Sequence, residues 1–209
     1  MRHGAAYIEE LITHGEHERQ DFKFRIADSR KIARSIAAFA NHAGGRLLIG
    51  VKDNGIVAGV SSEEEIYMVE QAASMYCRPP QPVEFVNHNV HGKIVVEAII
   101  GIADTRPVTA PDEHGNYVAY YRVADENVVV GRVHERVMSE SGAATISLGE
   151  RERRLLDYIG SHGAITVKGA TRLLHCSDEV AEQIVVAMCR MGIAEIDYHD
   201  NNCVITLTK

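Results

Sequence analysis

The chain has 209 residues and a formal net charge of −7, with 45% hydrophobic and 24% charged residues. These values indicate a globular protein of one large or two small domains, and they argue against a strongly basic coat protein for nucleic acid. The sequence shows no apolar run of membrane-spanning length, no signal peptide and no disulfide framework among its four cysteines. We therefore expect a cytoplasmic protein with reduced thiols and no membrane partner.

Hydrophobic periodicity and turn residues predict a first domain over residues 1–138 with helices between runs of strands. Helices are expected at 5–14, from a cap at Asp28 or Ser29 to about His42, and from Ser61 or Ser62 to just before Arg78. Strands are expected at 20–26, 46–53, 56–60, 83–89, 93–101, 117–123 and 127–134, with a loop over 102–115. This order predicts an α+β fold whose sheet is mixed, largely antiparallel, and flanked by helices.

A change of pattern predicts a linker at 139–147 and a small C-terminal domain at 148–209. The expected elements there are a helix at 150–161, a short strand at 165–167, helices at 168–174 and 177–191, and a hairpin at 193–208. This order is typical of a winged helix-turn-helix domain.

In such a domain the helix at 177–191 would be the one that reads DNA. We expect its core face to carry Val180, Ile184, Ala187, Met188 and Met191. We expect its outer face to carry Glu179, Glu182, Gln183, Val186 and Arg190. Because glutamates repel phosphates, the domain is expected either to dimerise or to bind DNA through Lys168, Arg172 and the wing.

Three acids stand near the ends of two predicted strands. Glu16 and Asp21 flank the start of the first strand, and Asp53 ends the strand at 46–53. If these strands are neighbours, the three carboxylates meet at one edge of the sheet and could bind Mg²⁺ or Mn²⁺. Strand alternation places Lys23 on the same face as Asp21, where it could contact a phosphate. The alternative is that the acids are simply solvated.

Basic residues concentrate in the same region, because residues 1–52 carry a net charge of +3 in an otherwise acidic chain. A face for binding phosphates could be built from Arg19, Lys23, Arg25, Arg30, Lys31, Arg34 and Arg46. The alternative is a solvated helix side. Asn41 with Gly44-Gly45 also has two interpretations: a helix end with close packing, or a small concavity for a phosphate or base.

The ordered set "GEHERQDFKFRI…IARSIAAFANHAGGRLLIGVKDNGIVAGV", followed by "RPV" and "YYR", resembles the Schlafen-type AlbA-like domain over about residues 7–138. The resemblance implies that Glu16, Asp21 and Asp53 match the three acids of nuclease members, with Asp21 standing where Glu is usual. It also implies nucleic acid as the partner, because many bacterial members are described as DNA-binding regulators with an appended winged helix. Some descriptions call the domain a divergent ATPase, but the sequence contains no phosphate-binding glycine loop.

Three functions follow as hypotheses. The first is a nucleic-acid-binding transcriptional regulator, expected to be a homodimer. The second is a metal-dependent endonuclease, directed at RNA, in which Glu16, Asp21 and Asp53 hold the ion and Lys23 assists. The third is an interaction module whose acids are structural.

Overall fold

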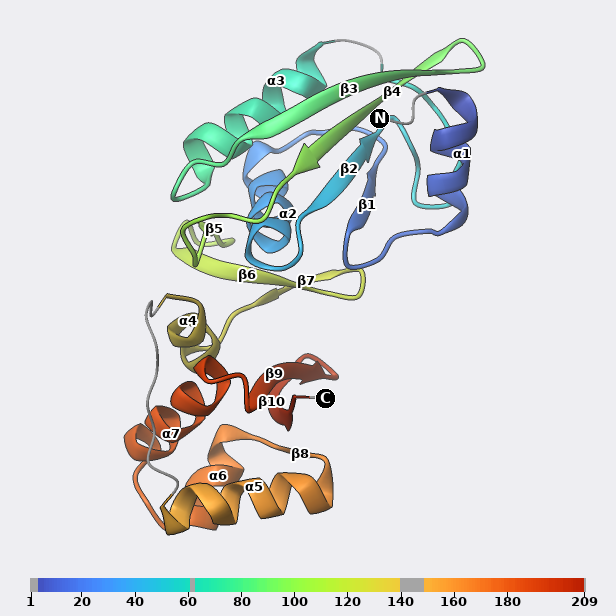
Figure 1. The fold of residues 1–209 in the computed structure, drawn as a ribbon. Coiled ribbons are helices and arrows are strands. Elements are labelled where there is room, and N and C mark those ends of the chain that lie inside the picture. The colour runs from blue at the N-terminus through green and yellow to red at the C-terminus, as the bar shows by residue number, and fades with distance from the viewer. Residues whose placement is uncertain (1–3, 61–62, 140–148, 209) are drawn as a thin grey trace. The chain divides into compact units, whose positions relative to one another are not determined.

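The computed structural model describes residues 4–60, 63–139 and 149–208 (Figure 1). They divide into two units, Met1–Val130 and Gly131–Lys209, each with its own hydrophobic core. Helices and mostly antiparallel strands alternate in both, which confirms the predicted α+β class. The described helices are all too short or too polar to span a bilayer.

The main sheet of the first unit has four strands in the order β1-β2-β4-β3. The strands are β1 Gln20–Lys23, β2 Gly45–Ile49, β3 Val83–Val90 and β4 Lys93–Ile100. β1 and β2 run parallel and the other pairs are antiparallel. Helix α2 (Ser29–Asn41) connects the parallel pair, as a parallel connection requires.

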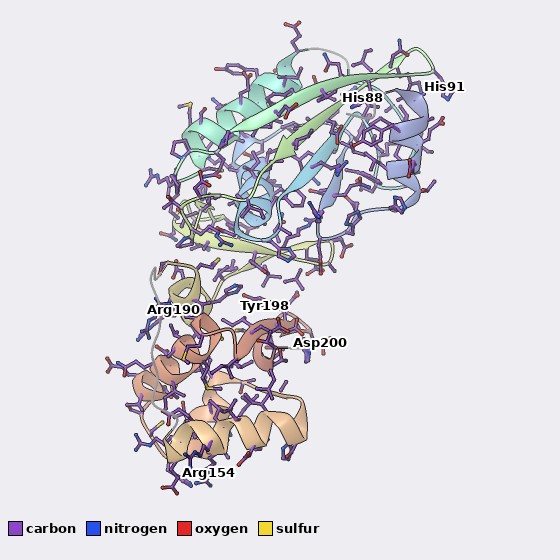
Figure 2. All side chains as sticks on the ribbon, in the orientation of Figure 1. His88, His91, Arg154, Arg190, Tyr198 and Asp200 are labelled. Atoms are coloured by element: carbon purple, nitrogen blue, oxygen red, sulfur yellow. The ribbon has the colours of Figure 1, made fainter. Side chains whose placement is uncertain are left out.

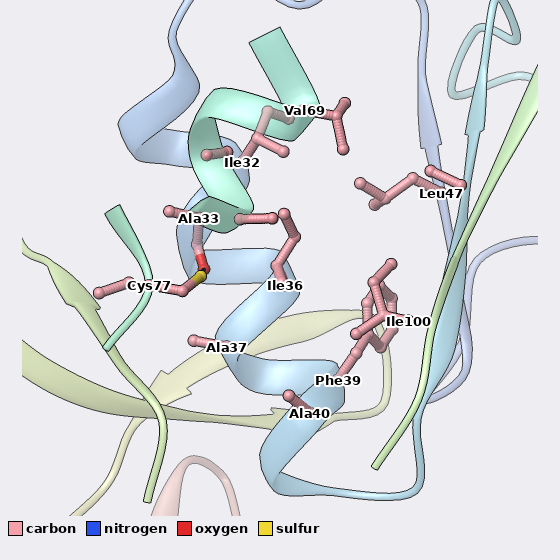
Figure 3. Packing of buried hydrophobic residues seen from close by; sticks show 14 of the residues in the cluster. Ile32, Ala33, Ile36, Ala37, Phe39, Ala40, Leu47, Val69, Cys77 and Ile100 are labelled. Carbon is pink, nitrogen blue, oxygen red and sulfur yellow. Dashed lines mark hydrogen bonds between the residues drawn. The ribbon is translucent and has the colours of Figure 1, made fainter. Parts of the chain in front are cut away.

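Both faces of this sheet are covered. Helix α2 packs on one face through apolar residues on nearly every turn, among them Ile36 and Phe39, which meet Leu47 and Ile100 from the sheet (Figure 3). Helix α1 (Ala5–Thr13) covers the other face, where Ile8 contacts the cluster around Phe22. Alternate residues of β1 therefore point to different layers.

Helix α3 (Glu64–Gln71) continues into a π-helical turn, Ala72–Tyr76, and ends before the proline-rich segment, as predicted. The expected caps Ser61 and Ser62 lie outside the described residues. The predicted strand at 56–60 is wrong, because only a single bridge between Val51 and Val57 forms there.

A second sheet of three strands, β5 (Thr109–Pro111), β6 (Tyr117–Val123) and β7 (Glu126–Val129), lies against α2. β5 falls in the segment expected to be a loop. Asn41 joins this sheet to α2: its Nδ2 donates to the carbonyls of Val108 (2.8 Å) and Tyr120 (2.7 Å), and its Oδ1 accepts from the Val108 N–H (2.7 Å).

The glycines after α2 have packing roles. Gly44 has φ +67°, which stops the helix, and a Cβ on Gly45 would collide with the Phe39 ring. Together with the buried Asn41, this arrangement matches the packing interpretation of this segment.

The second unit begins with a helix that the sequence did not predict, α4 (Arg132–Ser139), where a strand was expected up to residue 134. The expected linker at 139–147 lies outside the described residues except for Ser139. The helices that follow are α5 (Glu150–His162), α6 (Val167–Leu174) and α7 (Asp178–Arg190). The strands are β8 (Ala164–Ile165), β9 (Ala194–His199) and β10 (Asn202–Leu207), in the order β8-β10-β9. This is the element order that the sequence predicted.

Candidate functional site

Two of the three predicted acids meet at the start of β1. A tight turn, in which His17 and Gln20 exchange backbone hydrogen bonds of 3.0 and 3.1 Å, folds the chain back on itself. Glu16 Oε1 then accepts the Phe22 N–H at 2.8 Å, which brings its carboxyl group beside Asp21. The turn in "HGEHERQDF" therefore positions both acids without help from distant segments.

The two carboxyl groups ionise differently. Burial, followed by the hydrogen bond to Asp21, raises the pKa of Glu16 to about 7. Burial alone would raise the pKa of Asp21, but the hydrogen bond from Glu16 and the charge of Lys23 outweigh it and hold that pKa below its usual value. Below about pH 7 Glu16 therefore keeps its proton, while Asp21 carries the negative charge of the pair.

Cations already surround the Asp21 carboxylate. Lys23 Nζ lies 2.8 Å from Oδ2, which confirms that the two side chains share a face of β1. Arg122 Nη2 lies 3.7 Å from Oδ1, and Ser35 Oγ donates to Oδ2 at 3.4 Å. Asp21 is thus neutralised by side chains of β1 and β6 and contacted by α2.

Arg122 is buried and held in place from several sides. Its Nη1 donates to Asn127 Oδ1 at 2.9 Å and its Nη2 to the Gln20 carbonyl at 3.4 Å, while its guanidinium lies 5.1 Å from the centre of the Phe39 ring. Asn127 in turn donates to Ser35 Oγ at 3.0 Å. The result is a closed polar network linking both sheets and α2.

Asp53 is not part of this cluster. The β1–β2 register pairs Asp21 with Leu47, and Asp53 follows β2 in an exposed turn. Within the residues that the structure describes, no group of three His, Cys, Asp or Glu side chains is placed to hold a metal ion.

The donor set near Asp21 does not suit Mg²⁺ or Mn²⁺. A divalent ion needs several free oxygen ligands, whereas both Asp21 oxygens face protein cations and Glu16 Oε1 already accepts the Phe22 N–H. We therefore assign no metal-dependent step to Glu16, Asp21 or Asp53.

A pocket of about 460 Å³ opens beside this network. Three cations that the sequence singled out reach it: Lys23 from β1, and Lys31 and Arg34 from one side of α2. Arg34 is steadied by donation from its Nε to the Pro111 carbonyl at 2.9 Å. The other lining residues are Asp21, Ser35, Tyr120, Arg122, Asp125, Glu126 and Asn127.

The remaining predicted basic residues lie elsewhere. Arg19, Arg25 and Arg30 are exposed and do not line the pocket, and Arg25 and Arg30 rest on aromatic rings of Phe24 and Tyr76.

Arg46 takes part in a separate network. It pairs with Glu97 at 3.0 Å, together with Tyr7 and the buried His88. Figure 2 labels both histidines of this hairpin: His88 is buried, whereas His91 is exposed at the tip between β3 and β4. Lys168 and Arg172 are exposed on α6 in the second unit.

Sequence reasoning missed Arg122, Ser35 and Asn127. Arg122 stands in the "YYR" segment, which the sequence presents only as part of the family motif. The β6–β7 register places Arg122 directly opposite Asn127, so a correct hairpin alignment would have indicated the pair.

Comparisons with known proteins place the first unit in a family. A search among curated proteins gives no match. Among solved structures, 95% of the chain aligns with 38% of the DIP2311 protein of Corynebacterium diphtheriae, at 18% identity and a TM-score of 0.48. Similarly, 70% of the chain aligns with 96% of the N-terminal domain of a RecG-related protein from Nitrosomonas europaea, at 21% identity and a TM-score of 0.43.

Neither likeness carries a functional conclusion at these scores, and the chain spans less than half of the first of the two proteins. The family comparison is stronger. The model described as "Schlafen, AlbA_2" matches residues 16–131, which is more than half of the chain and includes Glu16, Asp21 and the pocket. The chain therefore belongs to the Schlafen, AlbA_2 family.

Proposed function

We propose that the first unit binds single-stranded nucleic acid in the pocket between α2, β1 and the β6–β7 hairpin. The observation that carries this proposal is the convergence of Lys23, Lys31 and Arg34 on one pocket in a chain of net charge −7. Lys31 and Arg34 are three residues apart, so they lie on one side of α2. Two cations on one side of a helix can contact the phosphate oxygens of a nucleic-acid backbone.

On the side of the β6–β7 turn the pocket carries two acidic residues, which limits the kinds of chemical group that can bind there. Asp125 and Glu126 come from the β6–β7 turn and would repel phosphate while accepting hydrogen bonds from hydroxyl or amino groups. A nucleotide has both kinds of group: a phosphate for the α2 side, and sugar hydroxyls or base amino groups for the hairpin side. The volume of about 460 Å³ lies in the range of small-molecule pockets. A duplex would keep its bases stacked, so a single strand fits this wall better.

The second unit is proposed to be a winged helix, on the basis of its element order and its three-stranded sheet. Transcriptional regulation and a homodimeric state remain proposals that accompany nucleic-acid binding.

The test compares two single charge reversals in the same unit. Lys31→Glu removes a pocket cation, whereas Lys93→Glu reverses an exposed lysine on β4 that does not line the pocket. Affinities for a labelled single-stranded RNA, the DNA of the same sequence and the duplex are measured by fluorescence anisotropy across a salt series, with EDTA or Mn²⁺. Thermal melts are used to check that both variants are folded.

We expect Lys31→Glu to weaken single-strand binding by roughly tenfold and to lower the salt slope by about one unit, while Lys93→Glu changes neither. We expect binding to be the same in EDTA and in Mn²⁺. Equal losses of affinity in both variants, or no binding at low salt, would contradict the proposal that this pocket binds nucleic acid. Cleavage that requires Mn²⁺ and is lost in Asp53→Ala would establish the endonuclease alternative instead.

A further inference from the structure

The helix that would read DNA in a winged helix presents only part of its predicted outer face to solvent, since Glu179 and Gln183 are exposed but two other residues of that face are not. The sequence predicted Glu182 and Val186 on the outer face of α7, yet Val186 is 2% exposed and the Glu182 side chain is 13% exposed. Of the predicted core face, Ile184 and Met188 are buried as expected, whereas Met191 at the end of the helix is 40% exposed. Some other segment of the second unit therefore covers α7.

That segment is α4. Arg132 Nη2 lies 2.9 Å from Glu182 Oε2, and Arg136 Nη1 lies 3.8 Å from the same oxygen. Between these cations on the helix, Val133 is 6% exposed and belongs to the same core cluster as Val186. Ion pairs at the margin and apolar contacts at the centre are the features of an intramolecular interface.

A further contact extends α4 to the hairpin. His134 is 6% exposed, and its Nδ1 lies 2.8 Å from the hydroxyl group of Tyr198 on β9, which Figure 2 labels. Helix α4 therefore contacts both α7 and β9, which are the two elements that a winged helix places nearest to DNA.

The part of α7 that stays exposed is unsuited to a duplex. Its first turn carries Asp178 and Glu179, both exposed, and their charge repels phosphates. The usual base-reading side chains would be Arg, Lys, Asn or Gln at these positions.

We infer that α4 is a built-in cover of the winged helix, which occupies the face that α7 would otherwise insert into a groove, and that it stays in place while the protein binds nucleic acid. This inference rests on the proposed winged-helix assignment and leaves nucleic-acid binding to the first unit. In the second unit α4 then remains part of the core, and α7 does not enter a DNA groove.

The test measures access to the covered face in the full-length chain. Val186→Cys places a thiol under α4, and Gln183→Cys places one on the exposed side of the same helix as a matched control. Maleimide labelling is followed by peptide mass spectrometry, which separates these thiols from the four native cysteines. Labelling is measured without nucleic acid and with saturating single-stranded RNA or duplex DNA.

We expect the thiol of the Val186→Cys variant to react at least about 100-fold more slowly than that of the control, because access requires local unfolding, and we expect nucleic acid to leave this rate unchanged. Arg132→Glu with Arg136→Glu should accelerate labelling, and adding Glu182→Arg should slow it again. Fast labelling of the Val186→Cys variant without nucleic acid would contradict the inference that α4 covers α7. Fast labelling only after duplex DNA is added would contradict the inference that α4 stays in place. If no nucleic acid binds, the function proposed for the first unit fails, whereas labelling at rest still decides the position of α4.

Discussion

Replacing Asn41 by alanine should destabilise the first unit without any ligand present. The side chain is 1% exposed and makes three hydrogen bonds of 2.7–2.8 Å, two to carbonyls and one from the Val108 N–H. Truncation leaves these backbone groups buried without a partner, at about 1–3 kcal/mol each, partly relieved by relaxation. We expect a loss of about 3–5 kcal/mol in the free energy of unfolding.

The assay is urea unfolding followed by circular dichroism, since the chain has no tryptophan. For a unit of this size the same loss lowers the melting temperature by roughly 10–20 °C. Asn41→Asp should be at least as harmful, because it keeps the acceptor for Val108 but places a carboxylate against two carbonyls. Asn54→Ala removes only one exposed hydrogen bond, from the Ile56 N–H at 3.2 Å, so it should cost no more than about 1 kcal/mol.

The result that would refute this reasoning is specific. If Asn41→Ala unfolds at the wild-type urea concentration but loses affinity for nucleic acid, the side chain binds ligand rather than joining α2 to the second sheet. The packing interpretation of Asn41 with Gly44-Gly45 would then be wrong.

Two further predictions concern stability. Because the folded-state pKa of Glu16 is about 7, against an ordinary value of 4.5, its ionisation opposes folding; stability should fall as pH rises from about 4.5 to 7. Glu16→Gln should remove this part of the pH dependence. The check is the urea midpoint of each protein at about pH 5 and at about pH 8; if the midpoint changes between these pH values by the same amount in wild type and variant, the prediction is wrong. Gly45→Ala should cost about 1–3 kcal/mol, because the added Cβ collides with the Phe39 ring. Gly101→Ala, which meets nothing within 4 Å, is the control, and equal melting of the two variants would count against the packing argument.

The parts of the fold that depend on local pattern were predictable. The alternation of "QDFKF" placed Asp21 and Lys23 on one face, and the helix ending at Gly44-Gly45 followed from its apolar stripe and its glycines. The elements that depend on tertiary contact were not. α4 reads as the end of a valine-rich strand, and its helical form is stabilised by packing on α7, which no local pattern reports.

The candidate site shows the same limit. Glu16 and Asp21 lie close in sequence, so a single turn brings them together. Asp53 was expected beside them if the two strands were neighbours. The strands are neighbours, but they run parallel, so the start of β1 and the end of β2 lie at opposite ends of the pair, and Asp53 is exposed in the turn after β2. Arg122 comes from about one hundred positions further along the chain, and only the packing of the second sheet on α2 brings it to Asp21.

The burial of Arg122 has a thermodynamic consequence for the pocket. Its guanidinium is already ordered by Asp21, Asn127 and the Phe39 ring before any ligand arrives. A nucleotide entering the pocket would restrict the motion of exposed side chains such as Lys31, but it would not have to order Arg122. Association should therefore proceed with little loss of conformational entropy in the protein, and related ligands should differ in affinity through the contacts they make.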